Sequence, residues 1–560
     1  MPKKLAITIA GAVSLGSYES GVLYEVIHAI GQHNSDPATT AEDRIEIDVL
    51  TGASAGGMTA TIAAQKLLFE AGSLDDPYAN SFYRPWVADV TLDGLLALQT
   101  GEDSTHSILS SNLVEDISRK HLTQRYQSHL TPPQSKHAAA ADKIRFGLAL
   151  SNLNGVDYSR NVLPSGAFAY TRYQDELTTE IDSGNPNHDT LDLWEPLRNA
   201  AVACGAFPFA FRTKDLVRQQ SEYTRRFVVP FPSLVETFTY TDGGVFQNEP
   251  LGMAKNLVDL IDPDHSEAEK RFYLFVAPGA RGGTSNTEFR EKVADFGATG
   301  KQLVAAVFQQ SRFHDWITAE DLNEKVRLFD KRALALQQAF LAFLAKPAGG
   351  AAIDPGPLAP AAKLLLPPLF GGDATAQAAA WQRLKGQFQK EFDQLVAANG
   401  GDASVAETWI DSILAFETAA DLGERDEMRI YGIVAREEEL ASSKFEAFLG
   451  FFDQAYRDHD YDVGRNRARD ILEAINKTAD PLGPIRYNPP PDRSDIHAID
   501  HDLDGLEMTD VPYELRKQFK DRLTSRAHDF MEEIGIPTAI VREAIDLAFI
   551  SPHLNKLLAL

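Results

Sequence analysis

The chain of 560 residues has one cysteine, Cys204, and no long uninterrupted apolar run. A single cysteine excludes an intramolecular disulfide, so the sequence carries no sign of an oxidising compartment. The thiol stands in the small-residue run "AVACGAF", where we expect it to be packed and inert. Because no apolar run approaches the roughly 18 residues that span a bilayer, we expect a cytoplasmic protein whose membrane contact, if any, is peripheral.

Basic residues are also scarce, with 54 Lys and Arg against 80 Asp and Glu and a net charge of −26. Nucleic-acid binding needs dense positive charge to neutralise phosphates, so no nucleic-acid partner is expected. The acidic excess is instead typical of a soluble protein. At this length, and with 44% hydrophobic residues, the chain is expected to form two or more domains.

The N-terminal residues 3–12 admit two interpretations. Two lysines, an apolar run and an Ala-Gly-Ala end resemble a short signal peptide with its cleavage site. Against this, the run alternates as "ITI", like a strand, and leads into a segment with helical spacing. We favour the strand.

Strand-like and helix-like runs alternate along the first half of the chain. The strand-like runs are "KLAITIA", "IEIDVLTG", "KIRFGLALSNL" and "KRFYLFVAPG", and helical runs follow the first two. Alternation of this kind predicts an α/β fold with a central, mostly parallel sheet flanked by helices. An insertion at 75–130 carries apolar side chains that belong either to a cap beside the site or to the core: Phe82, Tyr83, Trp86, Leu95 and Leu96.

Strand signals fade beyond about residue 285. We therefore predict a mainly helical C-terminal region at 286–560, with a Pro/Gly/Ala-rich linker near 346–380. A second break, "YNPPPDRSD", precedes the final helices. The charged stretch "YRDHDYDVGRNRARD" around His459 is expected to form surface or interdomain ion pairs.

The stretch "DVLTGASAGGMTATIAAQ" places Ser54 between Gly52 and Gly56, where a strand pattern turns into a helix pattern. This is the context of a nucleophile elbow, in which a sharp turn leaves room only for residues without bulk on either side of the serine. The helix N-terminus favours the negative charge that develops during acyl transfer. The motif alone is weak, and a glycine-rich turn with a helix-capping serine is the alternative.

Two further stretches strengthen the elbow interpretation. The turn in "GAVSLGSYESGVL" offers successive N–H groups that can hold an oxyanion. Downstream, "YTDGGVFQNEP" offers the carboxylate of Asp242, followed by Gly243 and Gly244, which allow the backbone to approach closely. A nucleophile, a carboxylate and an N–H nest together indicate acyl transfer.

With "VACGAFPFAF", these stretches resemble the patatin-like phospholipase family over roughly the first half of the chain. Ordinary α/β-hydrolases fit less well because they need a Ser, Asp, His order. The resemblance implies a patatin-like acyl hydrolase domain at 1–285 that cleaves lipid esters or phospholipids. The added C-terminal region is similar to that of larger bacterial patatin-like proteins.

The resemblance also implies the site residues. Ser54 would be the nucleophile and Asp242 its general base, a dyad without histidine, metal or cofactor. The backbone of Gly11, Ala12 and Val13 would supply the oxyanion N–H groups.

The oxyanion turn departs from the family's pattern, which has a run of glycines followed by a basic residue. Here Val13 is β-branched, which disfavours a positive φ, and no cation follows. The alternative function is therefore a lipid-binding or interaction protein on the same fold, with weak or lost catalysis.

Other motifs are weaker. The Gly11–Gly16 spacing resembles a P-loop, yet Ser17 and Tyr18 stand where a phosphate-binding lysine belongs. A calcium-loop pattern begins at Asp500, but Val511 replaces the bidentate glutamate, so no calcium site is expected. None of the 14 histidines carries a motif that ties it to Ser54. The sequence leaves the oligomeric state open.

Overall fold

The chain divides into two compact units. Unit 1 comprises Met1–Val258, Lys270–Asp315 and Ile430–Leu560, and unit 2 comprises Asp259–Glu269 and Trp316–Arg429. The computed structural model describes residues 1–97, 99–102, 105–127, 135–162, 166–208, 210–223, 228–263, 267–280, 289–292, 299, 302–303, 306–307, 314–345, 364, 366–370, 372–420, 428–443, 449–493, 508–533, 542–543, 546 and 550–560.

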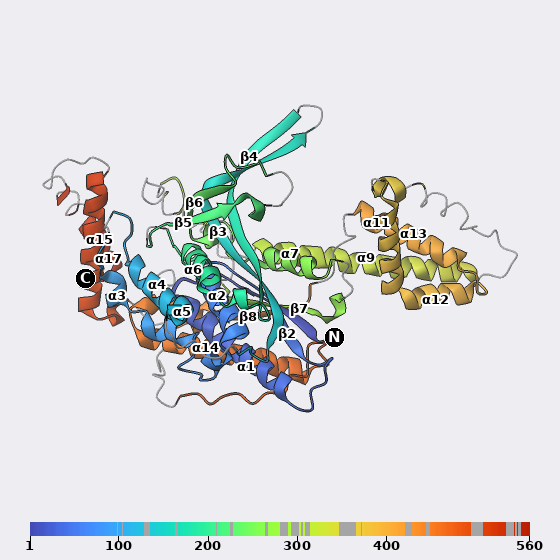
Figure 1. The fold of residues 1–560 in the computed structure, drawn as a ribbon, viewed down its shortest axis with the longest axis horizontal. Coiled ribbons are helices and arrows are strands. Elements are labelled where there is room, and N and C mark those ends of the chain that lie inside the picture. The colour runs from blue at the N-terminus through green and yellow to red at the C-terminus, as the bar shows by residue number, and fades with distance from the viewer. Residues whose placement is uncertain are drawn as a thin grey trace. The chain divides into compact units, whose positions relative to one another are not determined.

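Unit 1 is built on an eight-stranded sheet of order β5-β6-β3-β2-β1-β7-β8, with β4 paired to β3 (Figure 1). The strands β8, β7, β1, β2 and β3 run parallel, whereas β4, β6 and β5 pair in antiparallel fashion. The predicted mostly parallel α/β sheet is confirmed, and the N-terminal run is a strand. The strands are β1 (Lys3–Ile9), β2 (Ile45–Gly52), β3 (Ala140–Val162), β4 (Gly166–Asp182), β5 (Lys214–Gln219), β6 (Val235–Thr241), β7 (Arg271–Ala280) and β8 (Ile430–Arg436).

Helices cover both faces of the sheet. On one face, α2 (Ser54–Phe69) packs so closely on β3 that a Cβ at Gly57 would lie 3.1 Å from the Leu148 side chain. On the other face, a Cβ at Gly147 would lie 2.5 Å from Met253 of α7 (Leu251–Ile261). Strands buried on both faces are rich in apolar residues, which fits the apolar character of β1, β2 and β7.

The strand register places the chemistry-bearing residues at one edge of the sheet. Ile9 of β1 pairs with Gly52 of β2, and Gly52 pairs with Leu148 of β3, so their carboxyl ends are level. Ser54 follows this edge directly. Strand β6 runs the opposite way, with Thr241 beside Ser151, and so returns Asp242 to the same edge. Ligand sites of open parallel sheets lie at this position.

The C-terminal region is mainly helical, as expected, but it contributes one strand and does not separate from the first half at residue 285. Strand β8 extends the sheet beside β7, and α14 (Gln454–Lys477) packs along α1 (Gly16–Ser35), so residues from 430 onward belong to unit 1. The strand was missed because "IYGIVAR" is short and stands among helical patterns. Its partner strand lies far away in the sequence.

Unit 2 is a helical assembly with its own core, which includes Leu384, Phe392 and Trp409. Residues 346–363 of the expected linker lie outside the described part, but α11 begins at Ala374, so the end of the expected linker is helical. Of the helices described here, none is both long and apolar enough to cross a bilayer. The remaining helices are α3 (Leu92–Leu96), α4 (Ser111–Ser118), α5 (Gln124–Gln127), α6 (Leu191–Cys204), α9 (His314–Leu344), α11 (Ala374–Gln387), α12 (Gln389–Ala398), α13 (Ser404–Ala419), α15 (Tyr513–Glu533) and α17 (Ser551–Leu557).

Helices α1 and α14 pack together with their backbones in close contact at two glycines, Gly21 and Gly464. A Cβ at Gly464 would lie 2.1 Å from the carbonyl oxygen of Tyr18, and a Cβ at Gly21 would lie 1.9 Å from that of Tyr461. Beside this crossing, the buried Glu25 carboxylate accepts hydrogen bonds from Arg465. The expectation that this charged stretch forms surface or interdomain pairs is therefore wrong for its inner face, because the glycines bring it into the core of unit 1.

We predict that Gly464→Ala destabilises unit 1 by about 1–3 kcal/mol, the usual cost of overpacking. The added methyl group meets backbone, which can move away only if the two helices separate. Thermal unfolding followed by circular dichroism measures the effect. Gly386→Ala in α11 is the control, since a Cβ there meets nothing within 4 Å and alanine favours a helix. Equal melting temperatures for Gly464→Ala and the wild type would contradict the proposed tight crossing.

Candidate active site

Ser54 lies at the sharp turn between β2 and α2. Its φ is +51°, a left-handed conformation that is uncommon outside glycine. The turn leaves no space on either side of the serine. A Cβ at Gly52 would lie 2.4 Å from the carbonyl oxygen of Gly56, and a Cβ at Gly56 would lie 2.2 Å from that of Ala10. The two flanking glycines are therefore required by close backbone contacts.

The Ser54 hydroxyl donates a hydrogen bond of 2.6 Å to Oδ2 of Asp242. Both side chains are buried, with 7% and 1% of their surface exposed. The backbone N–H of Gly244 donates to the other carboxylate oxygen at 2.7 Å, which orients the Asp242 side chain. The Asp242 carbonyl accepts a bond from the Ser151 hydroxyl, which anchors the main chain beside β3.

Burial raises the pKa of Asp242 to about 7, although the hydrogen bonds from Ser54 and Gly244 act in the opposite direction. Removing a carboxylate from water disfavours its charged form. A base with a pKa near neutrality combines a substantial deprotonated fraction with useful proton affinity. The electrostatics of Asp242 therefore suit proton transfer from the serine.

Cys204, at the end of α6, lies beneath the start of α2. A Cβ at Gly57 would lie 2.4 Å from its sulfur, and the thiol is fully buried. Burial raises the pKa of the Cys204 thiol well above its usual value, so it stays protonated. The expected packed, inert thiol is what the structure contains.

Of the three residues expected to supply oxyanion N–H groups, Gly11, Ala12 and Val13, one has its N–H already bonded. The N–H of Gly11 donates to the carbonyl of Asn248 at 2.9 Å, so Gly11 is not available as an oxyanion donor. The N–H groups of Ala12 and Val13 have no acceptor among the described residues. Val13 has a φ of +52°, so this β-branched residue adopts the conformation that its side chain disfavours. Such strain costs roughly 1–3 kcal/mol.

Asn248 is a site residue that sequence reasoning did not assign. Besides accepting from Gly11, it has its side-chain Oδ1 only 2.2 Å from where a Cβ of Gly11 would lie. The same oxygen lies 2.7 Å from a Cβ built on Gly244. Asn248 thus joins the oxyanion turn to the Asp242 loop, and its only sequence signal was its place in "DGGVFQNEP".

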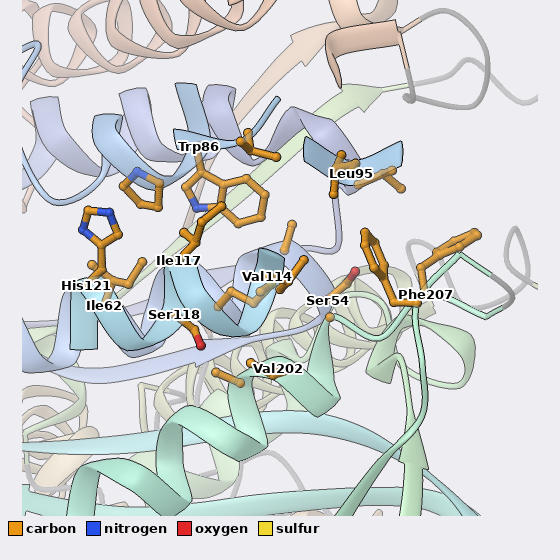
Figure 2. A pocket seen from close by; sticks show the side chains of 18 of the residues that line it. Ser54, Ile62, Trp86, Leu95, Val114, Ile117, Ser118, His121, Val202 and Phe207 are labelled. Carbon is orange, nitrogen blue, oxygen red and sulfur yellow. The ribbon is translucent and has the colours of Figure 1, made fainter. Parts of the chain in front are cut away.

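An apolar cavity with about 890 Å³ of empty space, part of it open to solvent, begins at Ser54. Figure 2 shows His121 far from Ser54 along the lining, with Trp86 and Ile117 between them and Phe207 on the other side of Ser54. The 75–130 insertion supplies much of the wall: Pro85, Trp86, Val90, Leu95, Val114, Ile117, Ser118, His121 and Leu122.

The apolar side chains of the insertion divide between the core and the cavity wall. Phe82 and Tyr83 are buried in the core of unit 1. Trp86 instead faces the cavity and packs on Gly16, where a Cβ would lie 2.5 Å from the indole ring. The insertion is tied to α14, because the buried Arg457 donates to the carbonyl of Val87.

The histidines offer no rival base among the described residues. His121 lines the cavity, but it is paired with Asp89 at 2.6 Å and lies at the end remote from Ser54 (Figure 2). His28 and His33 are bonded to other residues, Gln32 and Asp43. His497 and His501, together with the calcium-like stretch that begins at Asp500, lie outside the described residues.

A serine in the left-handed conformation, at a strand-to-helix turn on the carboxyl edge of a parallel sheet, has the geometry of a nucleophile elbow. Its hydroxyl donates directly to a buried carboxylate and not to a histidine. Residues 7–255 match the family model described as patatin-like phospholipase, which confirms the resemblance for this part of the chain. The matched family supports assignment to the lipid acyl hydrolases.

One curated relative is an uncharacterized protein, y4iI, of Sinorhizobium fredii. It is 25% identical over 389 residues, which cover 55% of this chain and 54% of the relative. The chain thus spans about half the length of the curated relative that it matches.

We predict that Asp242→Asn lowers turnover of a water-soluble ester by roughly 10² to 10⁴, the range for a lost general base. In the wild type, turnover should rise with pH through about 7, because only the deprotonated carboxylate accepts a proton. The raised pKa of Asp242 also affects the stability of the fold. The protonated carboxyl group stabilises the folded state fully at a pH below the pKa of Asp242 in the unfolded chain, and this contribution is lost as the pH rises through about 7. Asp242→Asn should therefore not melt below the wild type at pH 8.

The control is His121→Ala, which removes the histidine of the cavity. Steady-state rates and melting curves are measured for both variants. Near-full turnover in Asp242→Asn, with abolished turnover in a folded histidine variant, would replace the dyad with a histidine-based site.

Proposed function

We propose that this protein is a serine acyl hydrolase, of the lipase or phospholipase A kind, that cleaves lipid esters through Ser54 and Asp242. The observation that carries the proposal is the 2.6 Å hydrogen bond to Asp242 from the hydroxyl of Ser54, which lines an apolar cavity. The match of residues 7–255 to the patatin-like phospholipases supports a lipid substrate.

In the first half-reaction, Asp242 accepts the proton of the Ser54 hydroxyl while the serine oxygen attacks the ester carbonyl. The N–H groups of Ala12 and Val13 and the N-terminus of α2 stabilise the oxyanion. When the tetrahedral intermediate collapses, the bond to the alcohol breaks. The departing alcohol takes the proton from Asp242, and the acyl group remains on Ser54.

In the second half-reaction, a water molecule loses a proton to Asp242 and attacks the acyl-enzyme. The bond to Ser54 breaks, the fatty acid leaves, and the serine recovers its proton from Asp242. One carboxylate acts as base and then as acid in each half, so the cycle needs neither histidine nor metal.

The cavity is suited to the acyl chain. Its wall is almost wholly apolar apart from Ser54, Ser118 and His121. Each buried CH₂ group contributes about 0.8 kcal/mol, so a chain that fills the cavity binds more tightly than a short one. We expect the insertion at 75–130 to act as a cap over this chain.

A binding protein without turnover remains the second candidate, favoured by the strained, β-branched Val13 in the oxyanion turn. We predict that a fluorophosphonate probe labels the purified protein stoichiometrically, because Ser54 is activated by Asp242. Mass spectrometry locates the label. Ser54→Ala should abolish labelling, whereas Ser118→Ala, a serine of the same cavity wall, should retain it. Absence of labelling, under conditions that label a control hydrolase, would support the binding protein.

We predict that Trp86→Ala lowers kcat/KM for long-chain esters at least about tenfold more than for short-chain esters. The indole ring lines the cavity, so its removal affects only chains long enough to reach it. Trp86→Phe keeps most of the bulk and should give an intermediate effect. An equal loss on short and long esters would indicate unfolding or remote packing instead.

A further inference from the structure

The hairpin of β3 and β4 extends beyond the rest of the sheet (Figure 1). Pairing of β3 with β2 ends at Leu148, yet β3 continues to Val162 and β4 returns from Gly166. We call residues 156–162 and 166–173 the arm. Because Leu148 lies beside Gly52, the arm projects from the same edge of the sheet that bears Ser54 and Asp242.

Aromatic side chains line one face of the arm. Tyr158 and Tyr170 are paired across the two strands, and their rings stack with centroids 5.5 Å apart. Phe168 stacks on Tyr170 at 6.1 Å and is 60% exposed. Three successive rings thus lie together on a projecting hairpin, and the outermost of them, Phe168, is the most exposed.

A second aromatic contact joins the arm to the catalytic loop. Tyr173, on the opposite face of β4, is 47% exposed and stacks at 6.5 Å on Phe246. Phe246 follows Asp242 closely in the chain and is 43% exposed. The two faces of the arm therefore carry separate aromatic groups, and the group that contains Tyr173 contacts the loop that carries Asp242. Exposed apolar side chains on and near the neighbouring strands are Val217, Val229, Leu234 and Val235.

The charge of the arm differs from that of the chain. Between Val156 and Tyr173 the sequence has two arginines and one aspartate, whereas the whole chain carries a net charge of −26. Since charges are screened beyond about 10 Å, the charge of this segment acts on a nearby surface more than the net charge of the whole chain does. Tyrosine rings, apolar with one polar end, sit at the headgroup level of bilayers, and nearby arginines favour anionic lipids.

We propose that the arm docks the protein on a lipid bilayer, with Phe168 and Tyr170 at the headgroup level. This brings the carboxyl edge of the sheet, with Ser54 and Asp242, toward the surface that supplies the lipid. The proposal rests on the proposed function for the lipid substrate, but the docking itself requires no turnover.

The first test measures co-flotation of the full chain with vesicles of phosphatidylcholine and phosphatidylglycerol. The double variant Phe168→Ser/Tyr170→Ser should bind about tenfold or more weakly, since it removes two rings from the interface. Its turnover of a water-soluble ester should be unchanged. The matched control is Phe416→Ser in α13, a phenylalanine that is 63% exposed, which should bind vesicles like the wild type.

The second test locates the contact directly. Because Cys204 is buried, Phe168→Cys introduces the accessible thiol for an environment-sensitive fluorophore. On addition of the same vesicles, emission should shift to the blue and brighten several-fold. The same label on Phe416→Cys should not respond.

Absence of flotation, or a response at Phe416→Cys instead of Phe168→Cys, would overturn the proposal. If the label brightens without vesicles, in proportion to protein concentration, the arm contacts a second copy of the chain. That result would also overturn the proposal that the arm docks on a bilayer. Ser54→Ala should float like the wild type. If the Phe168→Cys label responds while no ester is hydrolysed, the docking stands and the proposed hydrolase function fails.

Discussion

The left-handed backbone of Ser54 is the constraint on which the rest of the site depends. A φ of +51° costs energy for any residue with a side chain, so the surrounding structure must enforce it. Here the enforcement comes from Gly52 and Gly56, whose backbones touch neighbouring carbonyl groups. The result is a hydroxyl that faces Asp242, a residue 188 positions later in the chain, at hydrogen-bond distance.

The C-terminal residues belong to the framework of this site. Helix α14 fixes α1, which begins just after the oxyanion turn, through the backbone contact at Gly464. It also holds the cavity wall, because Arg457 reaches the carbonyl of Val87. Buried charges such as Glu25 and Arg465 are tolerated because each has its partner. The match of residues 7–255 thus covers Ser54 and Asp242 but not all of the unit that contains them.

Two of the failed predictions depended on segments that are far apart in the sequence and meet in space. Gly11 was expected to donate to the oxyanion, but a carbonyl from the Asp242 loop takes its N–H. That carbonyl belongs to Asn248, whose role depends on two loops meeting in space. Likewise β8 joins the sheet through pairing with β7, a contact between segments far apart in the sequence.

The sequence by itself determined the α/β alternation, the elbow at Ser54 and the glycine turn at Asp242. These features are local, since hydrophobic period and turn glycines act within a few residues of one another. Only the tertiary structure decided that Ser54 and Asp242 touch, that Asn248 occupies the turn and that Trp86 faces a cavity. It also decided that the helical pattern around His459 packs inside unit 1. Such contacts join distant segments, and their free energy comes from packing that no short stretch of sequence contains.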